Sequence, residues 1–194
     1  MAQFDFCEAM RSLCADICRR HSRFQHIDLS RVVVTFAQAR SSVAWGMQAK
    51  LTPLRFENGA LSEFRDGQHW TVERLRHGGV EALYMLTFYL PRFLNMEPVE
   101  KLVTVFHELY HISPKFDGDI RRFAGPCYMH SRSQAEYDRK MAEYAREYVA
   151  AGAPKQLRQF LDYNFEQLRK TRGEVVGLKA RIPRVITVPD RIAG

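Results

Sequence analysis

Hydrophobic residues recur at helical spacing in four stretches of the chain, which predicts four main helices. The first covers about residues 4–20 and the second about residues 97–112. The third begins near Ser133, which is separated from Glu136 by the spacing of a capping box. The fourth is expected to run without a break over residues 154–172.

Runs of β-branched and aromatic residues predict the strands. Residues 27–36, which contain three successive valines, and residues 42–51 are two candidates. Residues 80–90 are a third, strongly apolar candidate, and its weak alternation indicates that both of its faces are covered. Turn residues between positions 55 and 76 favour loops or short hairpins, and the tail at 174–188 is rich in β-branched residues.

The composition is that of an ordinary globular protein, since 46% of the 194 residues are hydrophobic and 26% are charged. We therefore expect one α+β domain over residues 1–194 and exclude a chain that is disordered as a whole. A membrane span is not expected, because the sequence has no apolar run of about 18 residues. The N-terminus lacks the pattern of a signal peptide, which favours the cytoplasm. Cys7, Cys14 and Cys18 fall on one face of the first helix and are expected to be buried thiols.

The net charge of +7 is concentrated near the C-terminus, where residues 150–194 carry nine basic and four acidic side chains. A basic C-terminal segment of this kind, whose last part is residues 174–194, favours anionic partners, with nucleic acid first among them. Aromatic residues are scarce after Phe165, so base stacking is not indicated.

Residues 107–111 read His-Glu-Leu-Tyr-His and lie in the second predicted helix. Positions i and i+4 face the same side of a helix, so His107 and His111 can bind one tetrahedral metal ion. Glu108 is placed to take a proton from a metal-bound water, which makes it the candidate catalytic base. A closed structural site has no use for an uncoordinated carboxylate, so Glu108 favours a catalytic zinc over a structural one.

A zinc site that is open to water needs a third protein ligand. His130 is the first candidate, because the loop of residues 112–129 is long enough to fold back and bring it to the metal. The alternatives are carboxylates that follow the helix, namely Asp117, Asp119, Glu136 and Asp138. Asp117 and Asp119 could instead orient a ligand imidazole. Tyr128 is the candidate donor to the oxyanion, with Tyr137, Arg121 and Arg122 as alternatives.

The stretch HELYHISPKFDGDIRRFAGPCYMHSRSQAEYD, which begins at His107, resembles the metallopeptidases found in phage and bacterial genomes. These are similar to the SprT-like zinc proteases and to the wider zincin superfamily. The resemblance is strongest over residues 83–137, and it implies a zincin core with a small sheet, an HExxH helix and a second helix packed behind it. By this resemblance His107, His111 and His130 are the zinc ligands and Glu108 is the base.

Two departures limit what the resemblance implies. Ser131 follows His130 where SprT-like proteins usually have a glycine, and the chain lacks the cysteine pairs of their zinc ribbon. The role of those relatives in DNA repair is therefore not carried over.

The sequence favours a zinc-dependent metallopeptidase that acts on proteins or peptides. We expect the segment 83–90 to be the sheet strand that binds an extended substrate. The main alternative is a catalytically inactive zincin-derived binding module that engages nucleic acid through the basic C-terminal segment. A metal-dependent nuclease is a third hypothesis, but the long interval between His111 and His130 does not match the three-histidine endoribonucleases.

Overall fold

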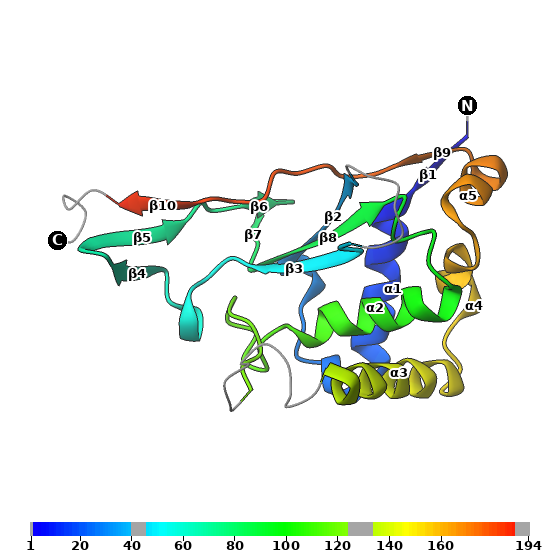
Figure 1. The fold of residues 1–194 in the computed structure, drawn as a ribbon, viewed down its shortest axis with the longest axis horizontal. Helices are drawn as coiled ribbons and strands as arrows, with labels where there is room; N and C mark the ends of the chain where they lie inside the picture. Colours follow the sequence, from blue (N-terminus) through cyan, green and yellow to red (C-terminus); the bar gives the residue numbers. More distant parts are fainter. Residues whose placement is uncertain (1, 40–45, 124–133, 189–194) are drawn as a thin grey trace.

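The computed structural model describes residues 2–39, 46–123 and 134–188, and its centre is a small mixed sheet (Figure 1). Strand β2 (Val32–Gln38) runs parallel to β8 (Tyr84–Leu90), and β3 (Ala49–Pro53) pairs with β8 in the antiparallel direction. The strand order is β2-β8-β3, so β8 is central and β3 is an edge strand. Burial of all of β8 except Tyr89 explains its continuous apolar sequence.

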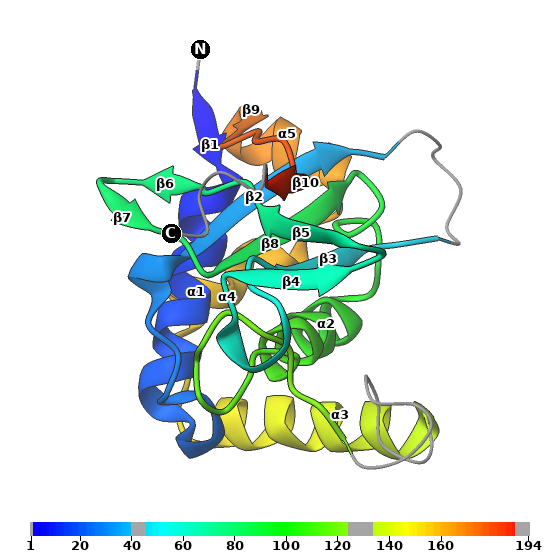
Figure 2. The same cartoon turned by 90° about the vertical axis from the view of Figure 1, so that its left-hand side faces the viewer.

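Two helices cover one face of this sheet, and a third lies against them (Figures 1 and 2). Helix α1 (Phe6–Arg20) begins where the Asp5 side chain accepts a hydrogen bond from the Glu8 N–H. Helix α2 (Pro98–Tyr110) begins with a capping box and a proline at its first position. Helix α3 (Gln134–Ala150) packs against α2.

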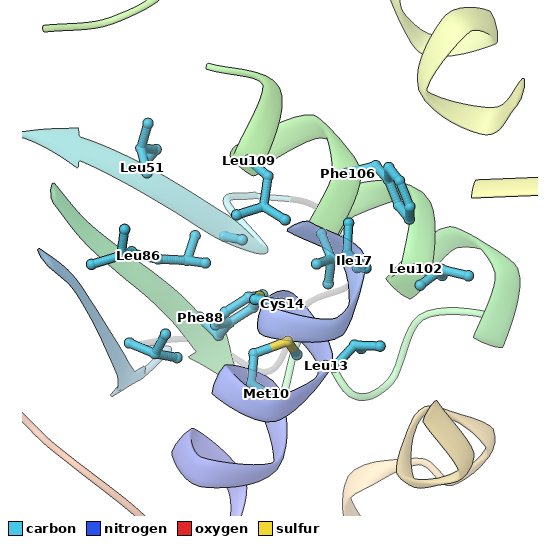
Figure 3. Close-up of a cluster of buried hydrophobic side chains, with 14 of the residues drawn as sticks. Met10, Leu13, Cys14, Ile17, Leu51, Leu86, Phe88, Leu102, Phe106 and Leu109 are labelled. Carbon is cyan, nitrogen blue, oxygen red and sulfur yellow. The ribbon is translucent and has the colours of Figure 1, made fainter. Parts of the chain in front are cut away.

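The main core lies between the sheet and the first two helices (Figure 3). Apolar side chains from α1, α2 and the strands interdigitate there, and each labelled residue in the figure is at most 8% exposed. These residues are Met10, Leu13, Cys14, Ile17, Leu51, Leu86, Phe88, Leu102, Phe106 and Leu109. Burial of this apolar surface is the main force that holds α2 beneath β3.

Short elements complete the fold. A second sheet has the order β10-β5-β4, and two strand pairs, β1 with β9 and β6 with β7, lie at the periphery. None of the helices in the described residues is long and apolar enough to span a membrane. The bounds of these remaining elements are β1 Gln3–Asp5, η1 Ser22–Phe24, η2 Leu29–Arg31, η3 Glu57–Gly59, β4 Ser62–Arg65, β5 Gln68–Val72, β6 Arg76–His77, β7 Val80–Glu81, α4 Lys155–Arg158, η4 Gln159–Asp162, α5 Phe165–Arg172, β9 Glu174–Val176 and β10 Val185–Val188.

The structure confirms the α+β class and the first three helices, with Ser133 outside the described residues. The strand predicted over residues 27–36 begins later, at Val32, because a short 3-10 helix precedes it. The segment 80–90 forms two strands, β7 and β8, and not one. Cys7, Cys14 and Cys18 are buried free thiols, as expected.

The basic C-terminal segment is partly neutralised within the fold. Arg181 and Arg184 both form ion pairs with Glu73, at 3.0 and 3.1 Å. These contacts join the segment to the strand β5 region, and binding of nucleic acid by this segment stays a prediction.

The continuous helix expected over residues 154–172 is wrong, and a buried lysine explains the break. Lys101 is 1% exposed, and its ammonium donates hydrogen bonds to the carbonyl oxygens of Leu161 and Tyr163, both at 2.8 Å. These two carbonyl oxygens therefore have a hydrogen-bond donor without a following turn of helix. The next helix, α5, begins with a capping box at Asn164. Burial lowers the pKa of Lys101 to about 8.

We predict that Lys101→Met destabilises the protein by about 2 kcal/mol, because two buried carbonyl groups lose their donor. Urea unfolding followed by circular dichroism measures this change. Lys170, which is exposed on α5, supplies the matched control Lys170→Met, for which little change is expected. Equal stability of the two variants would show that the Lys101 hydrogen bonds do not hold the helix break.

Candidate metal centre and active site

The two histidines of the HExxH sequence lie one above the other at the C-terminal end of α2. Their ring centroids are 4.7 Å apart, with an angle of 74° between the ring planes. Two imidazoles that bind one tetrahedral zinc through nitrogens at about 2.1 Å would place their centroids roughly 5 Å apart. His111 is 8% exposed, whereas His107 is less buried and lines a cavity. The spacing and the chemistry of these two donors therefore fit a zinc ion.

Glu108 lies on the side of α2 that faces the sheet. Its Oε2 accepts a hydrogen bond from the Leu51 backbone N–H of strand β3 at 2.7 Å. The side chain is 8% exposed, and burial raises its pKa to about 7, while Leu51 and Lys50 oppose this rise. A carboxyl group with a pKa near neutrality suits proton transfer at physiological pH.

Strand β3, not β8, presents the free edge of the sheet at this site. The expectation that residues 83–90 bind an extended substrate is wrong, because β8 is hydrogen-bonded on both sides. The Gln48 carbonyl oxygen accepts a hydrogen bond from the Tyr89 N–H, and the Leu54 N–H donates one to the Leu83 carbonyl oxygen. Successive residues of an antiparallel strand direct their backbone groups alternately toward the paired strand and away from it. The backbone groups of Ala49 and Leu51 therefore point away from β8. The Leu51 N–H on this edge is the one bound by Glu108.

Helix α3 supplies two side chains that contact the histidines. The ring of Tyr137 lies 4.9 Å from that of His107 and stacks at 5.7 Å on that of His111. Its hydroxyl donates to the His107 carbonyl oxygen at 3.5 Å, and burial raises its pKa well above the ordinary value. Asp138 Oδ1 lies 3.8 Å from His107 Nδ1. Tyr137 therefore packs both imidazoles, and Asp138 is the carboxylate beside one of them.

The loop after α2 fastens the end of this helix. The Arg121 N–H and Nε donate to the carbonyl oxygens of His111 and Tyr110, at 2.6 and 2.7 Å. The guanidinium also lies 4.1 Å from the centre of the Tyr110 ring. Arg121 thus satisfies carbonyl groups that the end of the helix leaves open, and this is a structural use of a residue that the sequence offered as an oxyanion donor.

The two aspartates of this loop also have structural contacts. Asp119 accepts hydrogen bonds from the backbone of Asn58 and from the Arg122 side chain, each at 3.0 Å. Asp117 Oδ1 accepts from the Asp119 N–H at 3.2 Å. Both aspartates therefore shape the loop, and Asp138 is the carboxylate that lies beside His107. Orientation of a ligand imidazole by Asp117 or Asp119 stays a prediction.

A third metal donor is not found in the part of the chain that the structure describes. No group of three His, Cys, Asp or Glu side chains there could hold a metal ion. Within the described residues, Asp117, Asp119, Glu136 and Asp138 form no such group with the two histidines. His130 and Tyr128 lie outside the described residues.

A family model described as "Putative phage metallopeptidase" matches residues 4–133, which is more than half of the chain. The chain belongs to this family of phage metallopeptidases. The match begins just before α1 and includes the whole HExxH sequence, but it ends before α3. Neither the curated proteins nor the solved structures contain a match. The phage metallopeptidase family thus indicates a metal-dependent peptidase, and the contribution of α3 lies beyond the matched residues.

The sequence of this phage metallopeptidase does not predict two features of the site, namely one hydrogen bond and the role of one tyrosine. The bond from Leu51 to Glu108 joins residues 57 positions apart, and nothing in the local pattern points to it. Tyr137 was weighed as an oxyanion donor, whereas it packs against both imidazoles. Its place on the buried stripe of α3 was the available signal, since Tyr137, Met141 and Tyr144 are all buried.

Proposed function

We propose that this protein is a zinc-dependent peptidase in which His107, His111 and His130 bind the metal and Glu108 activates water. The observation that carries the proposal is the buried Glu108 carboxylate, which the Leu51 N–H holds at the end of the helix where the rings of His107 and His111 lie 4.7 Å apart. The family match supports peptidase chemistry, and the HExxH helix beneath an antiparallel edge strand supports a zincin-like core.

Each residue of the site has a distinct part in the proposed reaction. A zinc ion bound there would polarise the scissile carbonyl and acidify a bound water. Leu51 occupies Oε2 of Glu108, so Oε1 is the oxygen that takes a proton from the attacking water and passes it to the leaving amine. Tyr137 limits the motion of both imidazoles by packing against their rings. Tyr128 is the proposed donor to the oxyanion.

The free edge of β3 is the proposed docking place for the substrate backbone. Extended peptides bind exposed sheet edges by adding a strand, and the outward groups of Ala49 and the Leu51 carbonyl are suited to this pairing. Because Leu51 also holds Glu108, a peptide on this edge lies close to the catalytic carboxylate.

We predict that Glu108→Gln keeps the zinc but lowers kcat by roughly 100-fold to 10,000-fold, because the amide cannot accept the proton. His111→Ala should lose most of the metal, since one ligand is removed. Elemental analysis of protein purified without added metal gives the zinc content, and hydrolysis of a mixed peptide library gives the activity. His77→Ala, which changes an exposed histidine on β6, is the control and should match the wild type.

Two outcomes of this experiment would count against the proposal. Zinc bound equally well by wild type and His111→Ala would contradict the metal site. Full activity or an unchanged phenotype in Glu108→Gln would contradict its role as base and would favour the inactive binding module.

We also predict that Ala49→Pro lowers kcat/KM for peptides by roughly three- to tenfold while the zinc content stays constant, because it removes an outward N–H from the substrate edge. Proline is tolerated at such positions, as Pro53 on the same edge illustrates. Ala49→Ser keeps the N–H and serves as the control. Steady-state kinetics on one cleaved peptide measures both variants, and identical values would exclude docking of substrate on β3.

A further inference from the structure

A long groove follows the seam between α2 and α3 away from the histidines. Its first part is a cavity of 880 Å³ that is lined by His107, Val103 and Val99 of α2 and by Asp138 and Ala142 of α3. Gln48, the residue before β3, also lines this cavity. The groove therefore starts at the proposed active site, at the end of the free sheet edge.

The groove continues into a second, apolar hollow of 460 Å³. Val99 and Ala142 line both parts, so the two hollows adjoin. The walls of the second part include Leu102, Val149 and Leu161. Val99 is 71% exposed and Val149 is 38% exposed, so two apolar side chains face solvent at a concave surface. Such a surface is suited to a large apolar side chain of a bound molecule.

The polar groups of the groove differ between its two parts. The part beside His107 is lined by the carboxylates of Glu97, Glu100 and Asp138. Arg92 also lines it, and its guanidinium donates a hydrogen bond to the Met47 carbonyl oxygen. A basic side chain is therefore favoured in this part. At the far end the charged lining residues are Arg146, Arg158 and Asp162.

The length of the groove can be converted into a number of substrate residues. Val99 lies eight residues before His107 on α2, and at 1.5 Å per residue this separation is about 12 Å. An extended peptide advances about 3.3 Å per residue, so it covers this distance in about four residues.

We propose that the groove binds one side of the substrate polypeptide, with a large apolar side chain in the hollow at Val99 and Val149 about four residues from the scissile bond. Basic side chains occupy the acidic part in between. This inference rests on the proposed peptidase function and adds a class of substrate to it, namely segments in which basic residues separate the cleaved bond from a bulky apolar residue.

The test is cleavage of a proteome-derived peptide library by the zinc-loaded protein. We expect leucine, isoleucine, phenylalanine or methionine to be enriched about tenfold near the fourth position on one side of the cut, with lysine and arginine enriched between. Val149→Glu should abolish the apolar preference and keep the basic one. Val80→Glu is the matched control, because Val80 is 39% exposed and lies outside the groove. Glu100→Gln, which retains an acceptor for the capping box, should weaken the basic preference.

A binding measurement separates failure of this inference from failure of the proposed function. The probe is a fluorescent peptide with two lysines followed by two leucines, and the background is the Glu108→Gln variant. We expect the double variant with Val149→Glu to bind this peptide about tenfold more weakly than the background. The double variant with Val80→Glu should bind it as tightly as the background does. Groove-dependent binding without cleavage by the wild type would overturn the peptidase and keep the groove. Cleavage without positional preference, or equal binding by the two double variants, would overturn the groove and leave the peptidase standing.

Discussion

The hydrogen bond from the Leu51 N–H to the Glu108 carboxylate sets the position of the HExxH helix against the sheet. It joins the edge strand β3 to α2 at 2.7 Å inside the core, where both partners are buried. Loss of either partner would leave a buried polar group without its bond, so the packing of α2 and the position of the carboxylate depend on each other. The same contact places the free sheet edge beside the residue that we propose as the base.

Three further interactions fix the positions of His107 and His111. Apolar burial fixes α2 on the sheet, Arg121 binds the carbonyl oxygens at its C-terminal end, and Tyr137 packs on both rings. The family match ends at residue 133, so Tyr137 and Asp138 come from a helix beyond it. The groove between α2 and α3 also depends on this helix, so one of its walls comes from residues beyond the matched part of the chain.

The parts of the fold and the site that depend on residues close together in the sequence could be predicted from it. The helical spacing through Leu102, Phe106 and Leu109 predicted one helix for the HExxH residues, and the structure has α2 over Pro98–Tyr110 with His111 at its C-cap. Strand order is not a local property, so the central place of β8 was missed and its apolar sequence was assigned to substrate binding. The break between η4 and α5 depends on Lys101, which lies 60 residues before Leu161 in the sequence, and helical periodicity could not report it. The role of His130 as the third ligand stays a prediction.

The central claim is that three imidazoles and one water surround a zinc ion. X-ray absorption at the zinc edge of protein purified without added metal tests this claim most directly. The account predicts about one zinc per chain with four nitrogen or oxygen neighbours at roughly 2.0–2.1 Å, three of them with the multiple-scattering signature of imidazole, falling to two in His130→Ala. Absence of zinc, sulfur ligation, or an imidazole count that His130→Ala leaves unchanged would contradict it.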